Sequence, residues 1–167
     1  MDFESGKGLL TVGLLLILFL GLFPPAALAG YVLALAGLKT VATWLGRGDI
    51  YRNFLYAFIL YLVSISILAA AFTASMPKAG EFEKEFAMWG PAAAVFLTTW
   101  ALGVGSAYFT KRAYNALGEA AAVSAFKTAA RLVWIGAITA IVFIGAVIFF
   151  IGLAFAVAGA LALRRPA

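Results

Sequence analysis

The chain of 167 residues is 65% hydrophobic and only 11% charged, with a mean hydropathy of +1.07 and a net charge of +5. A soluble domain is about half apolar and about a quarter charged, and a chain of this length cannot bury so much apolar surface in its own core, so the composition predicts an integral membrane protein. Because the sequence has no cysteine and no histidine, it excludes disulfides, thiolate and imidazole catalysis and the usual zinc and haem sites, and we expect no cofactor.

Four apolar blocks, separated by the charged stretches, predict the helices. A helix needs about 20 residues to cross a hydrocarbon core of about 30 Å, and the first and last blocks are about twice that length. Pro24 and Pro25 break the first block into two arms. Gly145 lies near the middle of the last block and permits a turn there, with one long tilted helix as the alternative.

The sequence therefore predicts a single all-α domain, residues 1–167, built as a polytopic bundle of about six transmembrane helices. The alternative is four or five spans with long outer helices. The six helices are expected at roughly 8–22, 26–45, 54–74, 91–117, 123–144 and 147–163.

The charges divide the connections into basic and acidic ones. Lysines and arginines cluster near Arg47, near Lys111 and at Arg164-Arg165, whereas the segment of residues 75–90 contains three glutamates. Six spans put every basic cluster and both ends of the chain on one side, and short loops rich in Lys and Arg face the cytoplasm. We therefore predict a multi-pass protein of the cytoplasmic membrane with both termini in the cytoplasm. The positive charge then contacts membrane lipid, and we expect no nucleic-acid partner.

The acidic segment has a helical pattern of its own. Phe82, Phe86 and Trp89 are spaced i, i+4 and i+7, which places the rings on one helical face. This pattern predicts a short helix lying in the membrane interface. A cation site made by the three glutamates is the alternative that we do not favour, because a helix spreads them around its axis.

Hydroxyl side chains inside the predicted spans are the first candidate site. They could line a narrow polar path, but such hydroxyls more often bond their own helix or one neighbour, and we favour packing over permeation. The residues of this possible polar path are Ser64, Ser66, Thr98, Thr99, Ser106 and Thr139.

Small residues at four-residue spacing form two stripes. Such stripes let helix backbones approach closely, within one chain or between copies, and we favour packing within the chain. The candidate helix-packing residues are Ala26, Gly30, Ala34, Gly152, Ala156 and Ala160.

No Asp, Glu, Lys or Arg falls at the centre of a predicted span. Lys39 comes nearest, and its long stem lets the ammonium group reach the lipid headgroups. Charges inside a membrane mark proton relays, voltage sensors and ion-coupled carriers, and a nucleophile–base pair would need the histidine or cysteine that the chain lacks. We therefore predict that the protein is not an enzyme.

Two stretches resemble a known family. Residues 50–58 read Ile-Tyr-Arg-Asn-Phe-Leu-Tyr-Ala-Phe, and Arg112-Ala113-Tyr114-Asn115 leads to Phe126-Lys127-Thr128-Ala129. With the long, glycine-punctuated apolar tail, these stretches resemble the archaeal membrane proteins grouped as domain of unknown function 996. The resemblance implies an archaeal cytoplasmic membrane and, by the family's own label, no activity. Where such proteins have a more polar turn, this chain has three alanines at 120–122, so we expect the connection to stay helical.

Polar residues of the same two stretches are the second candidate site. They lie on the predicted cytoplasmic side, where they could form a site for a partner or a lipid headgroup. Capping of helices and anchoring of the connections is the interpretation that we favour. The residues are Asp49, Arg52, Asn53, Arg112, Tyr114, Asn115 and Glu119.

Two functions are consistent with this pattern. We expect a non-catalytic structural or accessory membrane component that forms a homo-oligomer or joins a larger membrane complex, because buried charge is lacking and small-residue stripes are abundant. The alternative is a small channel or carrier for a neutral or weakly polar solute, which would use the hydroxyl residues.

Overall fold

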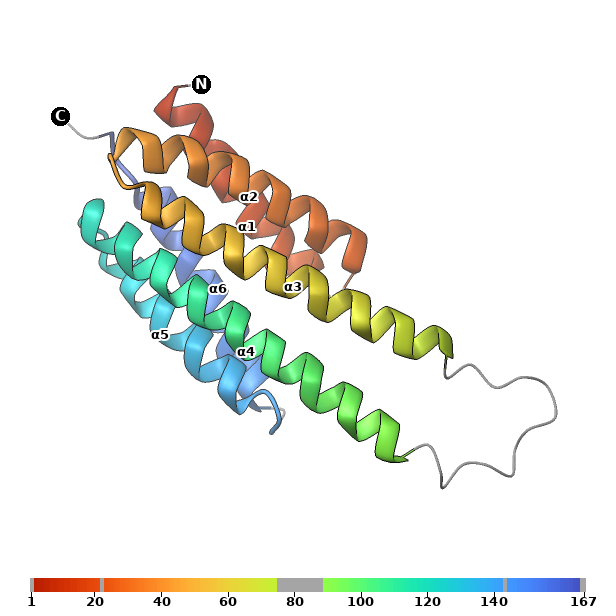
Figure 1. Ribbon diagram of the computed structural model, residues 1–167. Helices are drawn as coiled ribbons and strands as arrows, with labels where there is room; N and C mark the ends of the chain where they lie inside the picture. The colour runs from red at the N-terminus through yellow and green to blue at the C-terminus, as the bar shows by residue number, and fades with distance from the viewer. Residues whose placement is uncertain (1, 22, 75–88, 143, 166–167) are drawn as a thin grey trace.

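The chain forms six α-helices in the computed structural model, which describes residues 2–21, 23–74, 89–142 and 144–165 (Figure 1). The all-α fold predicted from the apolar blocks is confirmed. The acidic segment in which we predicted an interfacial helix lies, but for its last two residues, outside the described ones. In chain order the helices are α1 (Phe3–Leu20), α2 (Pro24–Trp44), α3 (Gly48–Ala74), α4 (Trp89–Ala120), α5 (Ser124–Thr139) and α6 (Ile144–Ala162).

The first two helices begin where the local sequence either caps the unpaired amides of the first turn or removes them. The amide of Ser5 donates to the carboxylate of Asp2 at 2.8 Å, so α1 begins well before the apolar run itself. This hydrogen bond favours the charged carboxylate and lowers the pKa of Asp2. Pro24 and Pro25 stand in the first turn of α2, where a missing N–H costs nothing. The prolines therefore both end the first arm and start the second.

The turns after α2 and after α4 share one geometry. Gly46 has φ +65°, and the amide of Arg47 then reaches back to a carbonyl in the last turn of α2. Ala122 has φ 55°, and the amide of Val123 donates to the carbonyl of Gly118 at 3.1 Å. A residue in the left-handed conformation thus ends each helix. The expectation that the alanine run stays helical is wrong, because Ala122 adopts this conformation in place of glycine.

The last apolar block is a hairpin and not one long helix. α5 ends at Thr139, and the amide of Val142 donates to the carbonyl of Thr139 at 2.9 Å in the turn. A Cβ atom at Gly145 would overlap the backbone of Thr139 and Ala140. Gly145 therefore marks the turn, as predicted, because only glycine lets α6 begin so close to the end of α5.

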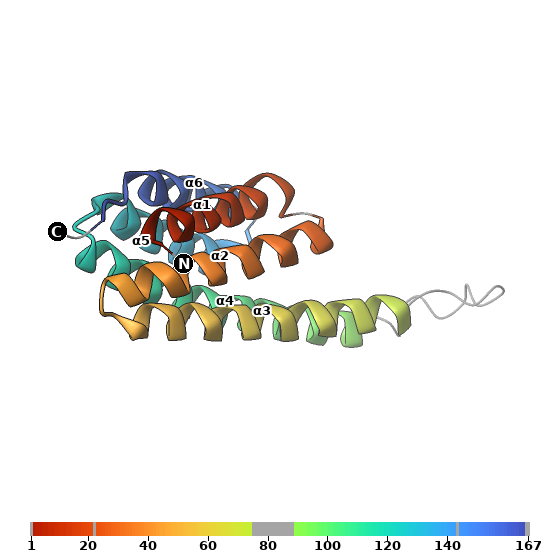
Figure 2. The ribbon, with the colours of Figure 1, turned by 90° about the horizontal axis from the view of Figure 1, so that it is seen from above.

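Three antiparallel hairpins build the bundle: α1 with α2, α3 with α4, and α5 with α6. Neighbouring hairpins meet along α2 and α3, along α4 and α5, and along α6 and α1, so the six helices close into a ring. Seen from above, α1 and α6 lie at one side of the ring, α3 and α4 lie at the opposite side, and α2 and α5 lie between these two pairs (Figure 2). α3 and α4 run on past the other helices, at the end far from both chain termini (Figure 1).

Glycines set the close spacing within the outer hairpins. A Cβ atom at Gly13 of α1 would lie 2.6 Å from the carbonyl oxygen of Gly30 on α2, and one at Gly152 of α6 would lie 2.8 Å from the amide nitrogen of Val133 on α5. Real Cβ atoms essentially never come so close, so these backbones touch only because side chains are absent. Of the six candidate packing residues, five are buried and one, Ala26, is half-buried.

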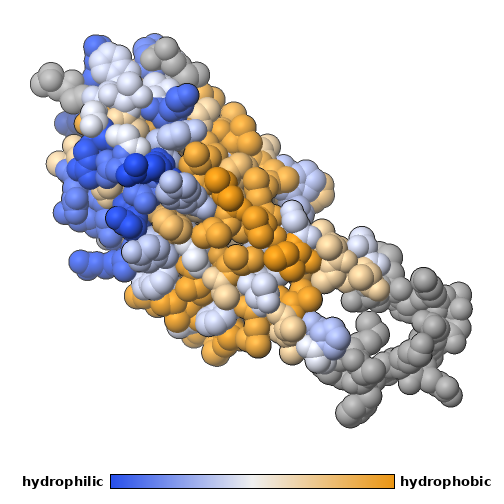
Figure 3. All heavy atoms as spheres, viewed as in Figure 1, coloured by the Kyte–Doolittle hydropathy of each residue, from blue (hydrophilic) through white to orange (hydrophobic). Residues whose placement is uncertain are grey.

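The helix lengths fit a membrane. Among the described helices, all but α5 are long and apolar enough to cross it. α5 has 16 residues, which extend over about 24 Å at about 1.5 Å per residue, against a hydrocarbon core of about 30 Å. Hydrophobic side chains cover the middle of the bundle, and hydrophilic ones gather at the end that holds both termini (Figure 3). The predicted six helices are thus present, and five of them have the length and composition to cross a membrane.

Candidate functional site

The charged side chains of the described residues lie in the half of the bundle nearest to the two chain termini, which we call the charged end (Figure 3). This end also contains the turn between α2 and α3 and the turn between α4 and α5. Basic side chains outnumber acidic ones there by ten to four. The basic clusters that lie far apart in the sequence therefore meet on one side of the molecule.

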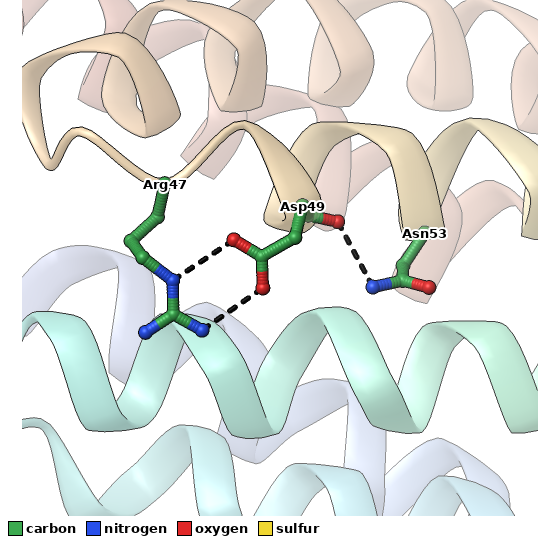
Figure 4. Close-up of polar contacts among 3 residues, drawn as sticks. All are labelled: Arg47, Asp49 and Asn53. Carbon is green, nitrogen blue, oxygen red and sulfur yellow. Dashed lines mark hydrogen bonds and ion pairs between the residues drawn. The ribbon is translucent and has the colours of Figure 1, made fainter.

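Arg47 and Asp49 form a bidentate salt bridge where the turn after α2 leads into α3 (Figure 4). Nε and Nη2 of Arg47 donate to different carboxylate oxygens of Asp49, both at 2.9 Å. Asn53 donates from its side-chain amide to the main-chain carbonyl of Asp49, also at 2.9 Å. The hydrogen bond from the guanidinium to Asp49 raises the pKa of Arg47. Both charged side chains are more than a third exposed, so water screens the pair and its contribution to stability is small.

The other members of the predicted polar cluster do not join this contact directly. The negative charge of Glu119 contributes to the raised pKa of Arg47, but Glu119 itself is exposed. The guanidinium of Arg112 lies over the ring of Tyr108, 5.9 Å from its centroid. Arg52 is exposed, Asn115 is half-buried, and Tyr114 is only 1% exposed inside the core. The structure therefore brings Asp49 and Asn53 together with Arg47 and turns Tyr114 away into the bundle.

Three basic residues make contacts that the sequence did not reveal. Lys7 donates from Nζ to the carbonyl of Leu163 at 2.8 Å, just beyond the end of α6. The guanidinium of Arg165 lies 4.6 Å from the ring centroid of Trp44 in α2. These two contacts join the residues after α6 to α1 and α2 and so close the ring at the charged end. The ammonium of Lys111 lies 5.1 Å from the ring centroid of Trp134, across α4 and α5.

The predicted hydroxyl residues divide into three pairs. Ser106 donates to the carbonyl of Ala57 at 2.8 Å, and Ser64 donates to the carbonyl of Thr99 at 3.2 Å, so both bonds join α3 to α4. The side chains of Thr99 and Thr139 donate to carbonyls of their own helices, at 2.9 Å and 2.7 Å. Ser66 and Thr98 are exposed on the outer surfaces of α3 and α4. The six residues do not form one continuous row.

A cavity of about 350 Å³ lies inside the ring, and all six helices contribute to its lining. Ser64 and Ser106 are the members of the predicted path that line it. The lining extends to Gly21 and Ala140, in the two short turns far from the charged end. Toward the charged end it stops at Phe54 and Tyr114, and fully buried side chains fill the bundle beyond them: Ile50, Leu117 and Phe126. The cavity is therefore closed on the charged side.

Three tyrosines from three helices line this cavity: Tyr31 of α2, Tyr61 of α3 and Tyr114 of α4. The ring centroids of Tyr31 and Tyr61 are 4.6 Å apart, and Phe54 lies between Tyr31 and Tyr114 at 6.0 Å and 6.1 Å. Their hydroxyls make no hydrogen bond to any described residue, although no fully enclosed polar side-chain atom of that part of the chain lacks a partner. The phenolic oxygens are therefore not fully enclosed by the protein, and all three tyrosines border the open space of the cavity.

These features define a multi-pass helical membrane protein whose helices close around an apolar cavity. The chain belongs to the family of proteins of unknown function DUF996, which matches residues 26–154. It is similar to the uncharacterized protein MJ1644 of Methanocaldococcus jannaschii, with 22% identity over 127 residues that cover 75% of this chain and 72% of that protein. No solved structure matches the chain. The family resemblance predicted from the sequence is confirmed.

Proposed function

We propose that the protein is a non-catalytic component of the cytoplasmic membrane that acts by association, with its own copies or within a larger membrane complex. The chemistry of the cavity carries this proposal. Among the described residues, no Asp, Glu, Lys or Arg lines it, and the hydroxyls of Ser64, Ser106 and Thr110 and the indole N–H of Trp100 are bonded to main-chain carbonyls. General acid–base catalysis works best with a group whose pKa lies near the operating pH, and a serine nucleophile needs an adjacent base. No Asp, Glu, Lys, His or Cys of the described residues lines the cavity to supply such a group.

The orientation follows from the charged end. Lysine and arginine near the ends of membrane helices are retained on the cytoplasmic side, and basic residues outnumber acidic ones there by ten to four among the described residues. We therefore place the charged end and both chain termini in the cytoplasm. A protease added to intact cells should spare a tag at the C-terminus. Cleavage of that tag from outside would contradict the orientation.

A small channel for a neutral solute is the second candidate. Ser64 and Ser106 support it because both line the cavity. The closure by Ile50, Leu117 and Phe126 argues against it, because a solute that entered would meet a packed core before reaching the charged end. Vesicles that contain the purified protein should therefore shrink and reswell in glycerol or urea at the rate of protein-free vesicles. A rate several times faster would favour the channel.

The association itself is tested by extracting the tagged protein from its native membrane in mild detergent and measuring the intact mass of what emerges. We expect a defined homo-oligomer or a complex with another membrane protein, stable on dilution. A protein that emerges only as a monomer, from cross-linked and from untreated membranes alike, would contradict the proposal.

A further inference from the structure

We propose that the cavity inside the helix ring is a binding site for a neutral amphiphile, a molecule with an apolar chain and one uncharged, oxygen-bearing end. The oxygen would accept hydrogen bonds from the tyrosine hydroxyls, and the chain would extend toward the turns at Gly21 and Ala140. This inference goes beyond the accessory role and does not depend on it.

The mostly apolar lining of the cavity favours an apolar ligand. Its volume of about 350 Å³ falls at the lower end of the range of about 300–1,000 Å³ that small-molecule sites occupy. Most of its lining is aliphatic or aromatic, including Trp100, Phe149 and Phe150. Water fills a cavity only where two to four polar partners hold each molecule. Water therefore does not satisfy this lining as a whole.

The tyrosine hydroxyls need a hydrogen-bond acceptor, such as an oxygen atom of the ligand. Ser64, Ser106 and Trp100 already donate to main-chain carbonyls. Tyr31, Tyr61 and Tyr114 have no hydrogen-bond partner among the described residues and come from three different helices. A hydroxyl kept from water without a partner costs free energy, and a carbonyl or hydroxyl oxygen in the cavity would remove that cost. The oxygen-bearing end is therefore expected at the closed side of the cavity, beside Tyr31 and Tyr114.

The ligand must be neutral. No charged side chain of the described residues lines the cavity, and the basic residues gather at the charged end, beyond the buried layer of Ile50, Leu117 and Phe126. A phosphate or carboxylate placed among these walls would lose its hydration without gaining a counter-charge. An alcohol or a ketone would not.

Three probes with the same hydrocarbon chain separate these requirements: farnesol, farnesene and farnesyl phosphate. Each is titrated into the full chain in detergent, and the thermal unfolding midpoint is followed, because a ligand that binds the folded state raises it. Farnesol should raise the midpoint most, farnesene less and farnesyl phosphate least. Equal shifts for farnesol and farnesene would overturn recognition of the oxygen, and a largest shift for farnesyl phosphate would overturn the neutral site.

The first variant fills the cavity with a larger side chain and so tests whether farnesol binds there. Gly103 lines the cavity on the same face of α4 as Trp100 and Ser106, and a Cβ atom there would meet no other atom within 4 Å. Gly103→Leu should therefore fold while weakening farnesol binding at least about tenfold. Gly90→Leu makes the same change in the same helix at an exposed position that is equally free of contacts, and it should leave binding unchanged. Equal binding by both variants would overturn the site.

The second variant removes two tyrosine hydroxyls and keeps the packing of the aromatic rings. Tyr31→Phe with Tyr114→Phe removes the hydroxyls and retains the rings. Farnesol binding should weaken about three- to tenfold, the effect of losing a neutral hydrogen bond, and farnesene binding should stay the same. Unchanged farnesol binding would contradict the placement of the oxygen beside Tyr31 and Tyr114.

Discussion

The ammonium of Lys7, in the first helix, donates a hydrogen bond to the main-chain carbonyl of Leu163, 2.8 Å away and just beyond the last helix. The C-terminal end of a helix carries unsatisfied carbonyls and a partial negative charge, so a lysine at this point stabilises the helix. α1 and α6 are far apart in the sequence and adjacent in the ring. Lys7 therefore fastens the contact that closes the ring.

Removing this ammonium should loosen the ring. Lys7→Met keeps the apolar stem and should lower the free energy of unfolding by about 1–2 kcal/mol, because a charged hydrogen bond at a helix terminus is lost. Tryptophan fluorescence during thermal unfolding in detergent measures the change. Lys39→Met is the control, since Lys39 is exposed. Equal loss in both variants would mean that the contact with Leu163 contributes nothing specific.

The left-handed alanine after α4 offers a stabilising change. Ala122 has φ 55°, a conformation that costs a residue with a side chain about 1–2 kcal/mol. Ala122→Gly should therefore raise the free energy of unfolding by about 1 kcal/mol, measured by the same unfolding experiment. Ala121→Gly, one residue earlier, should instead have no effect or destabilise. A decrease for Ala122→Gly would argue that this turn differs from the one described.

The close contact between α1 and α2 should tolerate no side chain at Gly13. Gly13→Ala would place a methyl group 2.6 Å from the carbonyl oxygen of Gly30, and separating the helices should cost about 1–3 kcal/mol. At Gly8, in the same helix, a Cβ atom would meet nothing within 4 Å. Gly8→Ala should therefore stabilise the helix by about 0.5–1 kcal/mol. If the unfolding midpoints of Gly13→Ala and Gly8→Ala moved in the same direction, the close backbone contact at Gly13 would be refuted.

The buried serine of α4 should contribute to packing. Ser106→Ala removes the hydrogen bond from the serine hydroxyl to the carbonyl of Ala57, which should cost about 0.5–1.5 kcal/mol. Thr98→Ala, at an exposed position of the same helix, should change stability by less than about 0.5 kcal/mol. Unfolding in increasing sodium dodecyl sulfate compares the two. A stable Ser106→Ala variant with faster glycerol entry into vesicles would instead support a permeation path.

The sequence predicted the elements better than their contacts. Two residues with strong backbone preferences fixed the hairpins: Pro24 cannot continue a helix, and Gly145 lets two backbones meet. Ala122 misled the prediction because alanine usually favours a helix, and the tertiary fold overrode that preference. The spacing of Gly30 and Gly152 indicated close packing, but not which helix each would meet.

The candidate sites depend on arrangement between helices, which one sequence does not encode locally. Arg47 looked like any basic loop residue until the turn brought it onto Asp49. Tyr114 was grouped with polar residues because of its neighbours in the chain, although helical rotation turns it into the core. Tyr31 and Tyr61 carry no sequence signal at all, because the cavity that they line forms only when all six helices pack together.

The number of crossings is the central claim, and α5 is its weakest point because it is the shortest helix. The chain has no cysteine, so single cysteines can be placed at Ser124, the exposed first residue of α5, and at Ala140, the exposed residue that follows its last one. Each is treated in intact cells with a maleimide that cannot cross membranes. Ala140→Cys should react from outside, and Ser124→Cys should react only after the membrane is opened. Reaction of both from the same side would show that α5 does not cross, and would contradict the six-helix ring as a membrane-spanning unit.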